Sequence, residues 1–410
     1  MKRLTPVVVL LAGACGTGES RQMVEISDSA GVPVTTSYDR PSSPPTDGWQ
    51  LSPTPRIQVG NRINPNQQLY GARHALRFPD GRIVVANTGL SDVRIFDAGG
   101  SHVRTLTMPA VRGDTINPVQ VHALPDDSIL VVGRDHSLSV FGPEGRLARR
   151  APVAEPAEGV PGTMSSVGMF EDGQVLFRVD LPDDPEATGT GRRRIRLLRY
   201  GTDGRLIGPY GDRDFEDQAL LFADRGGWIF GPSAQHAIAD STIWYGTAER
   251  FAVREIALDG RVLRVFRLDR PPIEVLSTDR STYSSVVGRQ MAGTGREAQM
   301  DTTLEASVFA DTFPAYDRIL VDDVGNVWVR DFQWFDLGSG RQWSVFDPTG
   351  RFLGSVRTPT RLQIFQIGPD FILARMVDNR GREAVYVYGL IKPGEEGGGG
   401  PEGGGGADGS

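Results

Sequence analysis

A short pattern that recurs six times along the chain constrains the fold more than any other feature. Each copy has an apolar stretch, a tight turn rich in aspartate or glycine, and a run of residues that favour β-strands. The two longer spacings between copies fit the same period with insertions, so the period is about 45 residues. A period of this length indicates an array of similar structural units. The turns are marked by Asp80, Asp126, Asp172, Asp240, Asp323 and Asp370.

A second turn follows the first one in each of the first five copies. It contains Glu144-Gly145 in the second copy and Asp259-Gly260 in the fourth. Such dipeptides between apolar strands predict hairpins, because the turn needs a positive φ that glycine adopts without strain. Each copy therefore contains four antiparallel strands, which is the composition of a propeller blade. The sequence predicts an all-β fold, a six-bladed β-propeller with four-stranded antiparallel blades.

The sixth copy, residues 361–391, supplies only three strands before the chain becomes rich in glycine. A closed ring leaves no long exposed strand edge, so a strand from elsewhere must complete this blade. Residues 56–60, just before the first blade, have the right character, and residues 32–36 are a second candidate. We therefore expect an N-terminal strand to close the ring.

Two segments of the first copy resemble six-bladed propellers of the NHL-repeat kind. They are Asp80-Gly-Arg-Ile-Val-Val-Ala-Asn87 and Val93-Arg-Ile-Phe-Asp97. The resemblance extends over most of the chain. In particular, the chain resembles extracytoplasmic bacterial lipoproteins built on such a propeller. It implies a fold and leaves the chemistry open.

The first fifteen residues resemble the signal of a bacterial lipoprotein. Basic residues 2–3 precede a mostly apolar run, and Ala12-Gly13-Ala14 precedes Cys15, the one cysteine of the chain. In such signals the cysteine is lipidated and becomes the new N-terminus; the same residues also fit a cleavage site for ordinary secretion. We expect a signal peptide at 1–14, lipidation of Cys15, and an extracytoplasmic position on a bacterial membrane, at the outer membrane or the periplasmic side. Without lipidation the protein would be secreted.

Composition suggests the remaining boundaries. We expect an N-terminal anchor and linker at 15–55, the propeller at 56–392, and a disordered glycine-rich tail at 393–410. One cysteine excludes an intrachain disulfide and a cysteine-based zinc site. A net charge of −7 argues against a nucleic-acid partner.

Four long connections should meet at one end of the ring. Residues 181–194 and 331–342 lie between the second and third strands of their blades, and 211–235 and 269–315 lie between blades. The tight turns belong to the opposite end, so we expect the binding face on the side of the insertions. Helical spacing predicts two short helices within 269–315, a small helical insertion between blades four and five. These helices would cover the channel mouth as a lid or pack against the blade sides.

The expected first strands of three blades carry histidines, and first strands line a propeller channel. His74 lies six residues before its turn aspartate, whereas His122 and His236 lie four before theirs. Because these registers disagree, we predict ligand contacts or structural hydrogen bonds for these side chains and no metal site.

Arginines near the ends of the second strands would face the inserted side. Arg134, Arg178, Arg330 and Arg375 could bind a carboxylate, a phosphate or a sugar acid. The alternative is a general preference for arginine, since the chain has 42 arginines and 2 lysines. Trp334 would mark a partner or sugar surface if it is exposed, and rim packing if it is buried.

No G-x-S-x-G, H-E-x-x-H or Walker motif occurs in the chain. We therefore predict a membrane-anchored binding module that uses the inserted face for a protein, a glycan or an anionic small ligand, without a cofactor. The alternative is a hydrolase or lyase that resembles the metal-dependent lactonases of this architecture and would use calcium at the channel mouth. Its best oxygen donors do not share one register: Asn87, Asp135, Asp180 and Asp331.

Overall fold

The computed structural model describes most of the predicted propeller. The described residues are 24–38, 48–60, 64–111, 114–154, 163–183, 186, 188–222, 227–335, 338 and 340–392. The expected signal peptide, Cys15 and the glycine-rich tail lie outside them.

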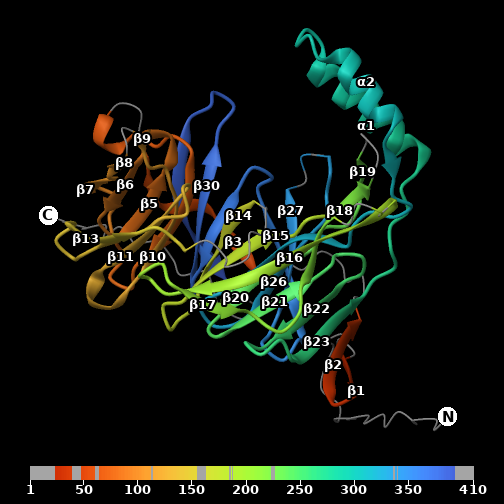
Figure 1. Ribbon diagram of the computed structural model, residues 1–410, viewed down its shortest axis with the longest axis horizontal. Helices are drawn as coiled ribbons and strands as arrows, with labels where there is room; N and C mark the ends of the chain where they lie inside the picture. Colours follow the sequence, from red (N-terminus) through yellow and green to blue (C-terminus); the bar gives the residue numbers. More distant parts are fainter. Residues whose placement is uncertain are drawn as a thin grey trace, which may run out of the picture.

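Six blades form a ring, each built on four antiparallel strands, and two of these sheets carry additional strands (Figure 1). The first blade is β4 (Ala72–Arg77), β5 (Ile83–Asn87), β6 (Asp92–Phe96) and β7 (His102–Thr107); the second is β10 (Pro118–Ala123), β11 (Ile129–Gly133), β12 (Leu138–Phe141) and β13 (Leu147–Ala151). The third is β14 (Met164–Met169), β15 (Val175–Asp180), β16 (Gly189–Tyr200) and β17 (Leu206–Pro209); the fourth is β20 (Gln235–Ala239), β21 (Thr242–Gly246), β22 (Ala252–Ile256) and β23 (Val262–Asp269). The fifth is β25 (Tyr316–Val321), β26 (Val327–Asp331), β27 (Arg341–Phe346) and β28 (Phe352–Thr358); the sixth is β29 (Gln363–Ile367), β30 (Phe371–Val377), β31 (Glu383–Ile391) and β3 (Gln50–Val59). The predicted fold class is confirmed.

Strand β3 closes the ring by pairing antiparallel with β31. Its register places Gln58 opposite Tyr386 and Val59 opposite Val385. Val59 is buried together with Val385 and with Ile83 of the first blade. The expected closing strand at 56–60 is therefore confirmed, although β3 begins earlier, at Gln50.

The second candidate strand lies elsewhere in the ring. Strands β1 (Val24–Ser29) and β2 (Val32–Tyr38) form a hairpin, and β2 pairs parallel with β23 at the outer edge of the fourth blade. The fully buried Ser37 accepts a 3.1 Å hydrogen bond from the backbone N–H of Phe352. Much of the segment expected as a linker is thus ordered strand, and only its residues 39–47 and those before 24 lie outside the described part.

The core is divided among the spaces between neighbouring blades. Each of six clusters of buried apolar residues draws its members mainly from two adjacent blades. Between blades five and six, for example, Trp328 and Trp343 pack with Ile364 and Ile372, all at most 1% exposed. A buried side chain of this size contributes roughly 1.5–3 kcal/mol, so every blade stabilises both neighbours.

The insertion after the fourth blade contains the two expected helices, α1 (Ser277–Met291) and α2 (Glu297–Glu305). They stand apart from the ring as an arm, at the upper right of Figure 1, and none of their residues is buried. At the base of the arm, β19 (Trp228–Ile229) pairs parallel with β24 (Val308–Phe309). In the described part of the chain, no helix is both long and apolar enough to cross a membrane.

Two of the connections expected as loops are partly strand. Strand β18 (Phe215–Phe222) pairs with the first half of β16, which extends the third blade beyond the ring. A short hairpin follows the first blade, and three 3-10 turns complete the described structure: β8 (Ala110–Val111), β9 (Asp114–Thr115), η1 (Pro65–Gln67), η2 (Thr88–Leu90) and η3 (Pro125–Asp127).

Candidate functional site

Seven aromatic side chains gather where the arm meets the inserted face of the ring. They come from the residue after β19, from α1, from β24 and the segment after it, and from the segment after β26. None is buried, and Phe335 is 40% exposed. We call this set the aromatic cluster: Phe230, Tyr283, Phe309, Phe313, Phe332, Trp334 and Phe335.

Phe230 is the centre of the aromatic cluster. Its ring lies 4.9 Å from the ring of Phe313, 5.2 Å from that of Trp334 and 5.3 Å from that of Tyr283. Its backbone has a φ of +60°, a conformation that a bulky residue adopts at a cost. Such strain persists only where the surroundings impose it, and it is concentrated at functional sites. The cluster thus has a fixed centre and a partly exposed edge.

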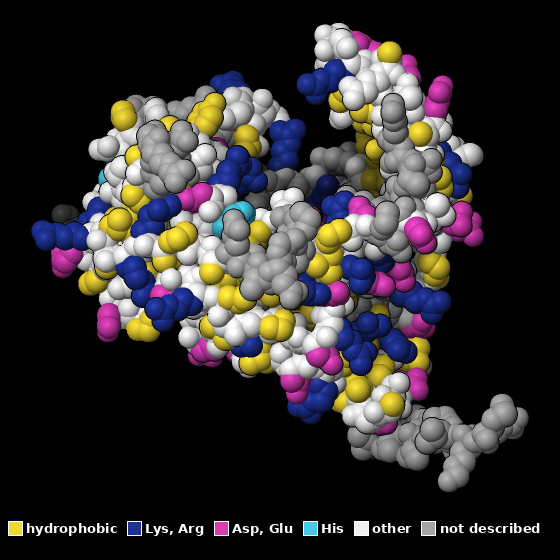
Figure 2. All heavy atoms as spheres, viewed as in Figure 1, with side chains coloured by type: hydrophobic (Ala, Val, Ile, Leu, Met, Phe, Trp, Pro, Cys, Tyr) yellow, Lys and Arg dark blue, Asp and Glu magenta, His cyan; other side chains and the backbone are white. Residues whose placement is uncertain are grey.

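The surface beside the cluster is hollowed. Figure 2 shows an open space between the arm and the blades to its left, with hydrophobic atoms on the side of the arm that faces the hollow. Lysine or arginine side chains are visible on the opposite wall. On α1, Val286, Val287 and Met291 remain partly exposed.

Trp334, the predicted aromatic site residue, belongs to the aromatic cluster and is partly exposed. Four of the other members were not anticipated as site residues: Phe230, Tyr283, Phe309 and Phe313. Tyr283 lies on α1, one of the two helices that the sequence predicted, but no local pattern indicates that these segments meet.

Three of the four predicted arginines are neutralised by carboxylates. Arg178 contacts Asp180 at 2.5 Å and the buried Asp217 at 2.6 Å. Arg330 lies 2.6 Å from Asp317. These guanidinium groups therefore have less capacity for an added anion than a free arginine has.

Of the other two predicted arginines, Arg375 is the third that pairs with a carboxylate, whereas Arg134 lies on the surface. Arg375 contacts Glu383 at 2.5 Å, and Glu383 also accepts hydrogen bonds from the backbone N–H groups of Gly71 and Ala72. Arg375 thereby helps to attach the sixth blade to the first. Arg134 is exposed and lies just after β11.

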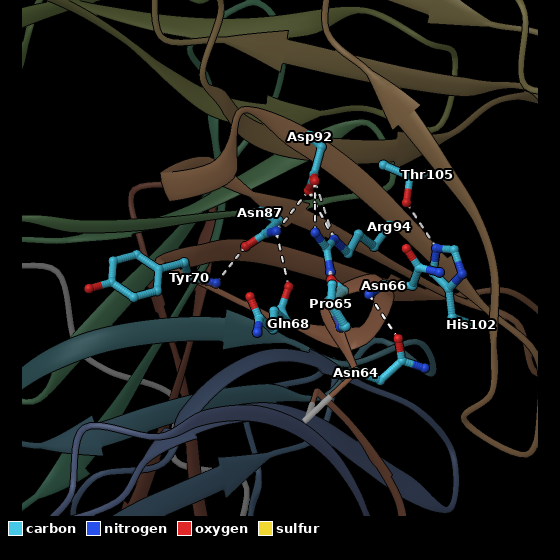
Figure 3. Close-up of polar contacts among 10 residues, drawn as sticks. All are labelled: Asn64, Pro65, Asn66, Gln68, Tyr70, Asn87, Asp92, Arg94, His102 and Thr105. Atoms are coloured by element: carbon cyan, nitrogen blue, oxygen red, sulfur yellow. Dashed lines mark hydrogen bonds and ion pairs between the residues drawn. The ribbon is translucent and has the colours of Figure 1, made fainter. Parts of the chain in front are cut away.

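The oxygen donors of the metal-dependent alternative are engaged in contacts of their own. Figure 3 shows the buried Asn87, which accepts a 2.6 Å hydrogen bond from the Tyr70 N–H and donates one of 2.7 Å to Asp92. Asp92 also pairs with Arg94, whose guanidinium donates to the carbonyl of Pro65. This network attaches the connection before β4 to the first blade.

The other three oxygen donors of the metal-dependent alternative each form an ion pair with a different arginine. Asp135 pairs with Arg150 at 2.7 Å, Asp180 with Arg178, and Asp331 with Arg270 at 2.8 Å. Across the described residues, no group of three histidine, cysteine, aspartate or glutamate side chains is arranged to hold a metal ion.

Of the three predicted histidines, the structure brings two together. The rings of His74 on β4 and His122 on β10 lie 5.6 Å apart and line a cavity of about 780 Å³. Burial lowers the pKa of His74 to about 4 and that of His122 to about 3, so both rings are neutral at pH 7. The cavity extends to the tight-turn end of the ring, opposite the arm, where it is lined by Glu171, Asp240 and Asp323.

His236 on β20 has different surroundings. Burial lowers its pKa to about 4, and the charge of Arg178 adds to this effect. Its Nδ1 is buried and has no hydrogen-bond partner within the described structure. His236 does not line the cavity of the other two histidines.

No protein-family model matches the chain, and no curated protein sequence matches it. Among solved structures, a Bacteroides fragilis protein described as exported is 10% identical, with a TM-score of 0.49 over 88% of this chain and 99% of its own. A DUF4221 family member from Bacteroides vulgatus is 11% identical, with a TM-score of 0.48 over 84% and 99%. Virginiamycin B lyase from Staphylococcus aureus is 9% identical, with a TM-score of 0.41 over 84% and 100%. At these values the comparisons carry no inference about ligand or chemistry.

Proposed function

We propose that this protein is an extracytoplasmic binding module, attached to a membrane by a lipid on Cys15, that holds a protein partner between the arm and the inserted face of the propeller. The aromatic cluster is the observation that carries the proposal. Aromatic side chains are enriched in the centres of protein interfaces, where they supply most of the binding energy. Here seven of them meet on the surface of a rigid ring.

The arm supports a protein partner over a small ligand. A helix of 15 residues is about 22 Å long. None of its residues is buried, so Val286, Val287 and Met291 have no complete apolar cover along that length. A small ligand stacked on the aromatic cluster would leave the apolar side chains of α1 exposed, whereas a protein surface would cover both the cluster and those side chains.

The ion pairs of the four predicted arginines also support a protein partner over an anionic small ligand. Three of the four side chains already pair with carboxylates, so an anionic small ligand would have to displace them. We propose no cofactor for this binding, and calcium belongs to the metal-dependent alternative. The signal-like residues 1–15 are the support for the extracytoplasmic, lipid-anchored position.

Site-specific photo-crosslinking in cells of the source organism tests this function. Benzoylphenylalanine replaces Phe335, which is 40% exposed, or Leu258 on the opposite end of the ring, which is 43% exposed. We expect a discrete protein adduct from position 335 and none from position 258. Adding Phe230→Ser, which removes the centre of the aromatic cluster, should abolish the adduct.

The Phe230→Ser protein must retain a cooperative thermal transition for that loss to count. Equal adducts at both positions would show nonspecific contact and would overturn the proposal. So would an adduct that survives Phe230→Ser, or no protein adduct together with a glycan adduct at position 335.

A further inference from the structure

The cavity at the tight-turn end is separate from the aromatic cluster and has a polar floor. His74, Gln120 and His122 line it, from the innermost strands of the first two blades. Its volume of about 780 Å³ lies within the range of about 300–1,000 Å³ that is usual for small-molecule sites. The hydrogen bonds around the two rings define which nitrogen atoms are left for a ligand.

The tautomer of His74 follows from its contact with the second blade. Its Nδ1 accepts a 3.4 Å hydrogen bond from the backbone N–H of Val121. A neutral ring that accepts at Nδ1 carries its proton on Nε2. Within the described residues this Nε2–H has no partner, so it is a donor available at the cavity.

The tautomer of His122 follows from Gln120. The amide nitrogen of Gln120 lies 3.4 Å and 3.3 Å from the carbonyl oxygens of Ser166 and Val167, and this fixes the orientation of the amide. Its Oε1 therefore accepts from His122 Nε2 at 3.3 Å. The neutral His122 ring then has an unprotonated Nδ1, which is an acceptor without a partner in the described part of the chain.

The two ends of the cavity exclude opposite charges. At the floor, the charge of Arg318 acts on His74 and disfavours its protonation, so a cation would be repelled there. At the mouth, the exposed Glu171, Asp240 and Asp323 disfavour an anion. The one arginine that lines the described cavity, Arg264, is paired with Glu255 at 2.6 Å. Carboxylates and an imidazole acceptor both suit hydroxyl donors.

We infer that this cavity binds an uncharged polyhydroxylated ligand, a sugar or a polyol. One hydroxyl oxygen accepts from His74 Nε2–H, and a neighbouring hydroxyl donates to His122 Nδ1. The mouth carboxylates accept from further hydroxyl groups. The site is independent of the arm and of its protein partner.

Matched amide substitutions test the assignment of each nitrogen. The side chain of Asn places its polar atoms near the δ position of histidine, and that of Gln places them near the ε position. His74→Asn therefore keeps the contact with Val121 and removes the Nε2–H donor, while His122→Gln keeps the contact with Gln120 and removes the Nδ1 acceptor. The reverse variants, His74→Gln and His122→Asn, keep the groups offered to the ligand.

Calorimetry on the full mature chain would use glucose, galactose, N-acetylglucosamine, maltose, trehalose and glycerol, with glucuronate and glucosamine as charged comparisons. We expect at least one uncharged compound to bind, with an affinity at least tenfold lower in His74→Asn and His122→Gln than in the reverse variants. The charged comparisons should bind more weakly than the uncharged compound they resemble. The inference is overturned if no uncharged compound binds, if a charged one binds as tightly, or if the four variants lose affinity equally.

Discussion

Gly173 and Gly204 occupy the two tight turns of the third blade with nearly the same backbone conformation, φ +85° and +79°. Their surroundings differ. A Cβ on Gly173 would meet no atom within 4 Å, whereas a Cβ on Gly204 would lie 2.2 Å from the carbonyl oxygen of Pro152. The first turn needs glycine for its conformation alone, and the second needs it also for the close approach of the neighbouring strand.

This pair predicts two different losses of stability. Gly173→Ala should lower the free energy of unfolding by roughly 1–2 kcal/mol, the cost of a left-handed alanine. Gly204→Ala should cost roughly 1–3 kcal/mol more, because the second blade must move to make space. Equilibrium unfolding in urea measures both, and equal losses would contradict the packing described here.

The candidate site also depends on single residues whose partners are distant in sequence. The sequence indicated His74, His122 and the arginines as polar groups on suitable strands. It could not indicate that Asp217, 39 positions after Arg178, would neutralise that arginine, or that Val121 would set the tautomer of His74. The first contact joins the third blade to the strand β18 added to it, and the second joins the first two blades, so no local pattern indicates either one.

Among the elements, β3 has the largest effect on topology because it joins the two ends of the propeller. Pairing Gln58 with Tyr386 encloses nearly the whole ring in one loop. The ladder between β27 and β28, where Gln342 faces Arg357, joins neighbouring strands of one blade.

A disulfide at each place should therefore stabilise the protein to a different degree. In a Cys15→Ser background, the cysteine pair at 58 and 386 closes a loop of about 330 residues, worth roughly 6 kcal/mol in the chain-entropy treatment. The pair at 342 and 357 closes about 15 residues, worth about 3 kcal/mol. Thermal unfolding of the oxidised and reduced forms measures the difference. The closure by β3 would be contradicted if the disulfide between positions 58 and 386 did not form. It would also be contradicted if that disulfide raised the stability no more than the one between 342 and 357.

The elements that sequence predicted well are those with local signals. The hairpin turns indicated the blades, and helical spacing predicted two helices within 269–315, where α1 and α2 lie. Residues 32–36 were the second candidate for the strand that closes the ring, whereas β2 lies at the edge of the fourth blade. The sequence could not indicate this place, because a parallel strand added at a blade edge has no turn that links it to its neighbour. Of the aromatic cluster, the sequence indicated Trp334 but not its neighbours on other segments, since the members are separated by up to 105 positions.

At the scale of the whole molecule, the ring holds two surfaces at opposite ends. The arm and the aromatic cluster lie on the inserted face, and the cavity with His74 and His122 extends to the tight-turn face. Six separate clusters of buried apolar residues lie between neighbouring blades and hold the blades that carry both surfaces. Under the two proposals made above, the ring is a scaffold that presents a protein-binding surface at one end and a sugar-binding cavity at the other.

The rate at which a single cysteine reacts with a maleimide tests the protein-binding face most directly. Once Cys15 is lipidated, Phe335→Cys and Leu258→Cys each add the one free thiol of the chain, at sites of similar exposure. The thiol at 335 should react several-fold more slowly in cells of the source organism than in the purified protein, and the thiol at 258 should react equally fast in both. Equal rates at position 335 in cells and in the purified protein would contradict the account.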